Sequence, residues 1–162
     1  MDILDLLVAD HENLRRLMAA MTNHLGDQRS TGPNDIVELD RFGLAEANAR
    51  LVSAFITHER LEDRCLLSAI RALEASGGLS AHDISEDHQT LRQLFQLLTA
   101  VERTCDGRHV HALREVLERV ERALEKHLEY EEEILFPSIR KNLPPDTLMS
   151  LGRTAEDLLQ RA

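Results

Sequence analysis

The sequence lacks the features of several large protein classes. It has no tryptophan, only 3% aromatic residues and two cysteines among 162 residues. With so few cysteines and no CxxC pair, a disulfide framework is excluded, and we expect a reducing, cytoplasmic compartment. No apolar run approaches the roughly 18 residues that a membrane span requires, and the acidic first residues do not resemble a secretory leader. We therefore expect a soluble cytoplasmic chain.

An excess of basic charge is also absent. Asp and Glu total 29 against 19 for Lys and Arg, which gives a formal net charge of −10. A chain of this charge repels a nucleic-acid backbone and an anionic membrane surface. We expect no nucleic-acid and no membrane partner, and cations are the more natural ligands.

Runs in which β-branched and polar residues alternate are missing as well, which predicts an all-α chain. Apolar residues recur at helical spacing in four segments, and they predict helices over about 3–25, 35–75, 80–106 and 110–141. Because the connections between these segments are short, the expected fold is an antiparallel up-down-up-down four-helix bundle over 1–141.

Glycine and proline predict where the helices are interrupted. The second segment is long enough to be broken near Gly43, and Pro137 should loosen the last turn of the fourth because proline removes a backbone donor. The remaining residues, 142–162, predict a short C-terminal helix outside the bundle, with Asp146 or Thr147 as its cap.

The chain repeats one helical hairpin. Matching patterns occur in the first and third predicted helices, as Asp10-His11-x-x-Leu14-Arg15 and Asp87-His88-x-x-Leu91-Arg92. A second pair of patterns occurs in the second and fourth, as His58-x-x-x-Glu62 and His127-x-x-x-Glu131. Two hairpins related by a pseudo-twofold axis would bring equivalent residues face to face at the centre of the bundle.

The repeated polar residues lie on apolar helix faces. Residues four apart project side by side from a helix, and the stripe of the fourth helix carries Leu124, His127, Glu131, Ile134 and Leu135. A buried carboxylate is costly unless it is paired or bound to a metal ion. Four imidazoles and two carboxylates are too many for one tetrahedral zinc, so they predict two ions bridged by carboxylate, with iron ahead of manganese and zinc.

This ordered set, with its Leu135-Phe136-Pro137 ending, resembles the hemerythrin-like HHE cation-binding family over about residues 1–141. The resemblance implies a four-helix bundle with a non-haem di-iron centre, in which an oxo group can add to the carboxylate bridges. It implies terminal ligands at His11, His58, His88 and His127 and bridging ligands at Glu62 and Glu131. Glu59 corresponds to a further carboxylate ligand in the iron-sensing, F-box branch of the family.

Several neighbouring residues allow two interpretations. Glu59 is either a ligand or a solvated surface carboxylate. Glu132 competes with Glu131 for the bridge, and we favour Glu131 because the carboxylate of the second helix also lies four residues after its histidine. Tyr130 either hydrogen-bonds a bound oxygen species or lies at the edge of the bundle. We expect Cys65 to fill the apolar core and the surface histidines to be His24, His82, His109 and His111.

The leading functional hypothesis is a di-iron protein that binds or reacts with oxygen, nitric oxide or peroxide. Oxygen-carrying hemerythrins have two histidines four residues apart on the third helix, and Arg92 occupies the second of these positions here. Arginine cannot be a ligand, and the equivalent residue of the first half is Arg15, so we expect no reversible oxygen carrier. The alternatives are an iron or oxygen sensor that acts through a protein partner and a metal-free helical adaptor.

Overall fold

The computed structural model describes residues 1–26, 40–75, 81–105 and 110–161. Within these ranges the chain is helical and contains no strand, which confirms the predicted fold class. The helices are α1 (Ile3–Gly26), α2 (Arg41–Cys65), α3 (Leu67–Ala75), α4 (Ala81–Thr104), α5 (Val110–Tyr130), α6 (Phe136–Asn142) and α7 (Pro145–Gln160). A π-helical segment, Glu131–Leu135, joins α5 to α6.

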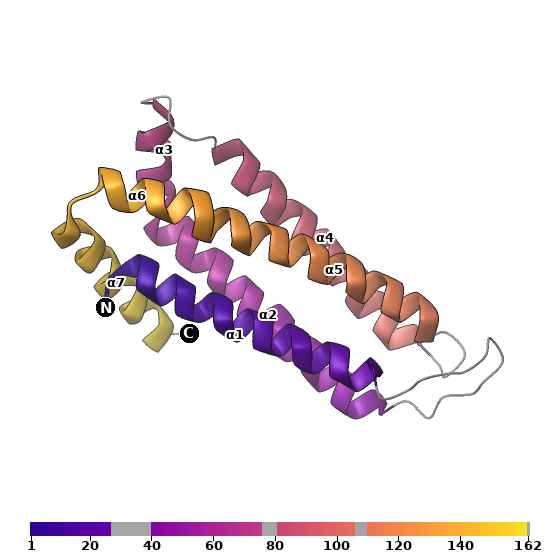
Figure 1. The fold of residues 1–162 in the computed structure, drawn as a ribbon. Helices are drawn as coiled ribbons and strands as arrows, with labels where there is room; N and C mark the ends of the chain where they lie inside the picture. Colours follow the sequence, from indigo (N-terminus) through magenta and orange to yellow (C-terminus); the bar gives the residue numbers. More distant parts are fainter. Residues whose placement is uncertain (27–39, 76–80, 106–109, 162) are drawn as a thin grey trace.

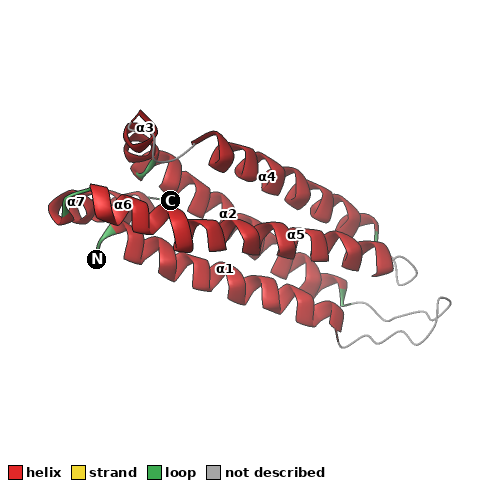
Figure 2. Cartoon of the chain, turned by 45° about the horizontal axis from the view of Figure 1, so that its top comes forward, coloured by secondary structure: helices red, strands yellow, loops and turns green. Residues whose placement is uncertain are grey.

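The four long helices α1, α2, α4 and α5 form a bundle in which each is antiparallel to the next along the chain (Figure 1, Figure 2). α1 packs against α2, and α4 packs against α5. Each long helix has an apolar stripe, and packing the four stripes together removes them from water. No helix in the described part of the chain is both long and apolar enough to cross a membrane.

The second predicted helix is in fact two helices, so the expected division into four helices plus one is wrong. Gly43 does not interrupt the chain, because it lies inside α2, where its amide donates a hydrogen bond of 2.9 Å to the Asp40 side chain that caps the helix. The break falls at Leu66, and α3 leaves the bundle at an angle to α2 (Figure 1). The bend lets Ile70 and Leu73 of α3 join an apolar cluster at this end of the bundle, where α3 packs against α4 and α6.

Pro137 loosens the fourth predicted helix, as expected, and the loosening takes the form of a π turn. Since proline has no N–H, it cannot bond to the carbonyl four residues earlier. One residue before the proline, the N–H of Phe136 bonds to the carbonyl of Glu131, five residues back, as in a π turn. The wider turn rotates Ile134 away from the apolar stripe on which its spacing places it, and its side chain is 51% exposed.

The C-terminal helix α7 begins at Pro145, so neither Asp146 nor Thr147 caps it. Proline suits the first turn of a helix because an N–H at this position would have no helical partner. α7 packs against α1 and α2, on the outside of the bundle. The domain boundary predicted after residue 141 stays a prediction.

Two apolar clusters fill the bundle, one on each side of a polar layer. On α1, Leu7 belongs to one cluster and Leu14 to the other, and His11 lies between them. α2 passes from one cluster to the other across His58 in the same way. The polar layer is therefore enclosed by apolar packing at both ends.

Candidate metal centre

Six side chains from the four long helices and the π segment meet in the polar layer. Each is at most 3% exposed, and the six are His11, His58, Glu62, His88, His127 and Glu131. They are the residues that the internal repeat predicts to face one another. The helical spacing of four residues places His58 beside Glu62 and His127 beside Glu131, while α1 and α4 supply one histidine each.

Glu131 contacts three of the histidines. Its Oε1 lies 3.2 Å from His127 Nε2. Its Oε2 lies 3.1 Å from His11 Nε2 and 3.6 Å from His58 Nε2. The carboxylate of Glu131 thus links α5, α1 and α2 at the centre of the layer.

Glu62 contacts two histidines on the other side of the layer. Its Oε2 lies 3.0 Å from His88 Nε2 and 3.4 Å from His58 Nε2. One nitrogen or oxygen from each of His58, Glu62, His127 and Glu131 lies within 4.8 Å of the corresponding atoms of the other three. The two carboxylates therefore share His58 and face each other across a small space.

The atoms that face this space have no hydrogen bonds. The Nε2 atoms of all four histidines and both carboxylate oxygens of Glu62 and Glu131 are buried without a partner of hydrogen-bond geometry. Burying so many unsatisfied polar atoms is costly, and proteins rarely do so without a ligand. A metal ion would satisfy them, and a set of imidazoles and carboxylates suits iron, manganese or zinc.

Burial in this layer also shifts the pKa values of the glutamates and histidines. Burial, together with the neighbouring Glu131 carboxylate, raises the pKa of Glu62 to about 7. Burial alone would also raise the pKa of Glu131, but the close contacts with His11 and the charges of the surrounding histidines hold it well below its usual value. Burial lowers the pKa of His127 to about 3, so this imidazole is neutral. Burial alone would lower the pKa of His58 and of His88, but the neighbouring carboxylates raise both. Because neutral imidazole and ionised carboxylate are the forms that bind metals, His58, His88 and Glu62 release protons when an ion binds.

Three histidines have a second carboxylate at their other ring nitrogen. The Nδ1 distances are 2.8 Å for His11 to Glu132, 3.3 Å for His58 to Asp10 and 3.5 Å for His88 to Glu59. Sequence reasoning gave Asp10 no role, although its place in the repeated Asp-His pair was an available signal. Glu59 is buried at the edge of the layer and forms an ion pair with Arg92, and its role as a ligand stays a prediction.

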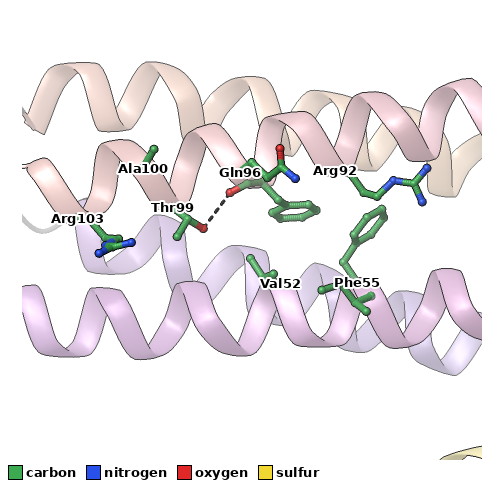
Figure 3. A pocket seen from close by; sticks show the side chains of 9 residues that line it. Val52, Phe55, Arg92, Gln96, Thr99, Ala100 and Arg103 are labelled. Carbon is green, nitrogen blue, oxygen red and sulfur yellow. Dashed lines mark hydrogen bonds between the residues drawn. The ribbon is translucent and has the colours of Figure 1, made fainter.

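A cavity of about 370 Å³ opens between α2 and α4 beside this layer. Its lining is mostly apolar, with Phe55 and Arg92 at one end and Arg103 at the other (Figure 3). The Phe55 ring lies edge-on to the His88 imidazole, with the ring centroids 6.3 Å apart. This end of the cavity is therefore separated from the polar layer by one layer of side chains.

The remaining predicted residues lie outside the layer. Cys65 is buried in an apolar cluster, as predicted, and burial raises the pKa of its thiol. Tyr130 is half-buried and packs against the same cluster. Two of the histidines predicted at the surface are exposed, His24 and His111, and the side chains of the other two, His82 and His109, lie outside the described part of the structure.

Histidines and glutamates that converge from four helices into one buried cluster define a helix-bundle protein with a candidate cation-binding centre. Residues 79–158 match the family described as Hemerythrin HHE cation binding domain, so this half of the chain belongs to that family. The match contains His88, His127 and Glu131, and the internal repeat places His11, His58 and Glu62 at the equivalent positions of the first half. No curated protein and no solved structure matches the chain.

Proposed function

We propose that the chain is a non-haem di-iron protein that reacts with a small oxidant or diatomic molecule, such as oxygen, peroxide or nitric oxide, and does not carry oxygen reversibly. The observation that carries this proposal is the set of buried, unpartnered nitrogen and oxygen atoms that face one small space. Two iron ions held there would supply redox chemistry and open coordination positions for the small molecule.

The contacts within the layer support a role for each side chain. His11, His58, His88 and His127 each turn Nε2 toward a central carboxylate, which is the orientation of a terminal ligand. Glu62 and Glu131 each contact histidines from different helices, which is the position of a bridge. Glu131 is the stronger candidate than Glu132, because Glu132 lies at the outer nitrogen of His11 and is only partly buried.

The apolar residues around the layer keep the histidine rings in place. The ring of Phe136 stacks on that of His11, with centroids 5.4 Å apart and an angle of 26° between the planes. Phe55 contacts His88 from the other side of the layer. Packing of this kind restricts solvent and holds the ligand atoms in a fixed arrangement, as a reactive metal centre requires.

The first test of the proposal is metal content. Protein produced in iron-replete cells is expected to contain about two metal ions per chain, mainly iron. The four Nε2 atoms and the four oxygens of Glu62 and Glu131 make eight unpartnered donor atoms, more than the six positions of one octahedral ion. Elemental analysis of protein purified without added metal measures this directly. One zinc ion and no iron per chain would contradict the proposal.

The second test is the reaction of the iron(II)-loaded protein with oxygen. α4 offers no second imidazole four residues after His88, because Arg92 stands there and pairs with Glu59. A centre with one imidazole fewer keeps an open position, so we expect rapid oxidation in air that is not reversed when oxygen is removed. Stopped-flow absorbance follows the reaction, with zinc-loaded protein as the redox-inert control. A change in absorbance that is fully reversed by deoxygenation would show that the protein is a carrier.

A further inference from the structure

The arginine of the repeated Asp-His-x-x-Leu-Arg pattern has no part in the proposed metal centre, although it recurs in both halves of the chain. Arg15 lies four residues after His11, and Arg92 lies four residues after His88. This spacing puts each arginine on the same face of its helix as the histidine, one turn further along. Both arginines are therefore placed to act on the surroundings of the histidine that precedes them.

On α1, Arg15 holds the carboxylate that contacts His11. Glu132 Oε1 lies 2.8 Å from His11 Nδ1 and accepts a hydrogen bond of 2.8 Å from the Arg15 guanidinium. The guanidinium also donates from Nε to Glu125, at 3.0 Å. Glu132 is thus fixed between a cation and an imidazole, and its pKa is lowered because hydrogen bonds from Arg15 and His11 outweigh the effect of burial.

On α4, Arg92 stands in the same relation to His88. Glu59 Oε1 lies 3.5 Å from His88 Nδ1 and forms an ion pair with the Arg92 guanidinium. The side chain of Glu59 is only 8% exposed, whereas that of Arg92 is 49% exposed and reaches the end of the cavity between α2 and α4 (Figure 3). A carboxylate buried to this degree requires a partner, and Arg92 supplies it.

The two arrangements are equivalent although their carboxylates are not repeated in the sequence. Glu59 directly follows His58, while Glu132 directly follows Glu131. Each carboxylate comes from a helix other than the one that carries the histidine and the arginine. The same three groups, imidazole, carboxylate and guanidinium, therefore meet twice in the bundle by different routes through the chain.

We propose that Arg15 and Arg92 are positioning residues that act through Glu132 and Glu59. Each arginine fixes a carboxylate that accepts the Nδ1 proton of the histidine, which leaves Nε2 without a proton and aimed at the central carboxylates. A histidine that binds a metal commonly donates its other N–H to such a carboxylate, which fixes its tautomer and orientation. The inference rests on the proposed metal centre and gives Glu59 a role beside His88 in place of a role on the metal.

The test uses zinc, which is diamagnetic and redox-inert, bound to the full chain labelled with nitrogen-15 at histidine. The variants are Arg15→Gln and Arg92→Gln, and the controls are the exposed arginines of the same helices, Arg16→Gln and Arg103→Gln. Two properties are measured: the exchange with water of the Nδ1 protons of His11 and His88, and the rate at which zinc passes to an excess of chelator.

We expect Arg15→Gln to accelerate exchange of the Nδ1 proton of His11 alone, and Arg92→Gln that of His88 alone. Each arginine pairs with a carboxylate that contacts Nδ1 of one histidine. Zinc release should become about 10- to 100-fold faster in both variants, which is the usual effect of removing a residue that hydrogen-bonds to a metal ligand. Lysine at either position keeps the positive charge, so Arg→Lys should restore part of the slow zinc release. The control variants should match the wild type.

Two results overturn the inference, and they differ in what else they overturn. If the wild type binds zinc but Arg15→Gln and Arg92→Gln leave proton exchange and zinc release unchanged, the positioning role of the two arginines is wrong, while the proposed metal centre is unaffected. If the wild type takes up neither zinc nor iron, the proposed metal centre is wrong, and the positioning role of the two arginines is wrong as well.

Discussion

Removal of the bound metal is expected to lower the melting temperature of the protein substantially. The six side chains of the polar layer lie between two apolar clusters, so a loss of order there affects packing on both sides. Without a cation, the buried nitrogen and oxygen atoms that face one another have no hydrogen bonds to replace it.

The size of the effect follows from mass action. An ion that binds only the folded chain contributes about 4 kcal/mol per site when its free concentration is a thousand times Kd. For a chain of this size, that corresponds to a fall in Tm of roughly 8 to 16 °C for each site that is emptied. Two sites should give more than one, although their contributions need not add because they share Glu62 and Glu131.

The measurement compares thermal melts of metal-loaded and chelated protein in the same buffer. A variant in which both Glu62 and Glu131 are glutamine serves as the control, because a chain that cannot hold metal should melt at the same temperature with and without chelator. Superimposable curves for the loaded and chelated wild type would favour the alternative of a metal-free helical adaptor.

Sequence spacing was sufficient to predict which side chains meet in the polar layer. Helical geometry places His58 beside Glu62, and His127 beside Glu131, whatever the rest of the fold does. The internal repeat then pairs the two hairpins, because equivalent residues of a pseudo-twofold bundle face one another. The first argument depends only on local order along the chain, and the second depends on a repeat that can be found in the sequence directly.

The interruptions of the helices were harder to predict, because they depend on packing. Leu66 has apolar neighbours on both sides, so nothing in its periodicity marks the bend between α2 and α3. Pro137 does predict a loosened helix, but whether the missing hydrogen bond produces a kink or a π turn depends on the tertiary contacts of the segment. The exposure of Ile134 follows from that choice.

The ion pairs whose carboxylates contact Nδ1 of His11 and His88 could not be predicted from the spacing of residues in the sequence. Arg92 and Glu59 are 33 residues apart in the chain, and Arg15 and Glu132 are 117 apart. Pairs at such separations are formed by the packing of helices, and a single sequence contains no signal for them. The sequence identified Arg92 as the residue that replaces a ligand, while its partner is visible only in the structure.

Replacement of Glu131 by glutamine is expected to have the largest effect of any single substitution on metal binding. Glu131 contacts three histidines, whereas Glu62 contacts two. Glu131 is therefore the more central carboxylate, and its replacement removes the negative charge that lies next to the largest number of ligand nitrogens. Glutamine keeps the volume of the side chain, but it is neutral and cannot neutralise two cations.

The expected order of metal loss is Glu131→Gln, then Glu62→Gln, then Glu59→Gln, with the exposed Glu129→Gln unchanged as the control on the same helix as His127. We expect Glu59→Gln to weaken binding by about 10- to 100-fold, as for a group behind a ligand, and the two bridging variants to exceed that range. The metal retained after passage through a desalting column, with the release rate to a chelator, measures the order. If Glu59→Gln alone empties the centre while Glu131→Gln keeps both ions, then Glu59 is a ligand, Glu131 is not a bridge, and the roles given to the two carboxylates must be exchanged.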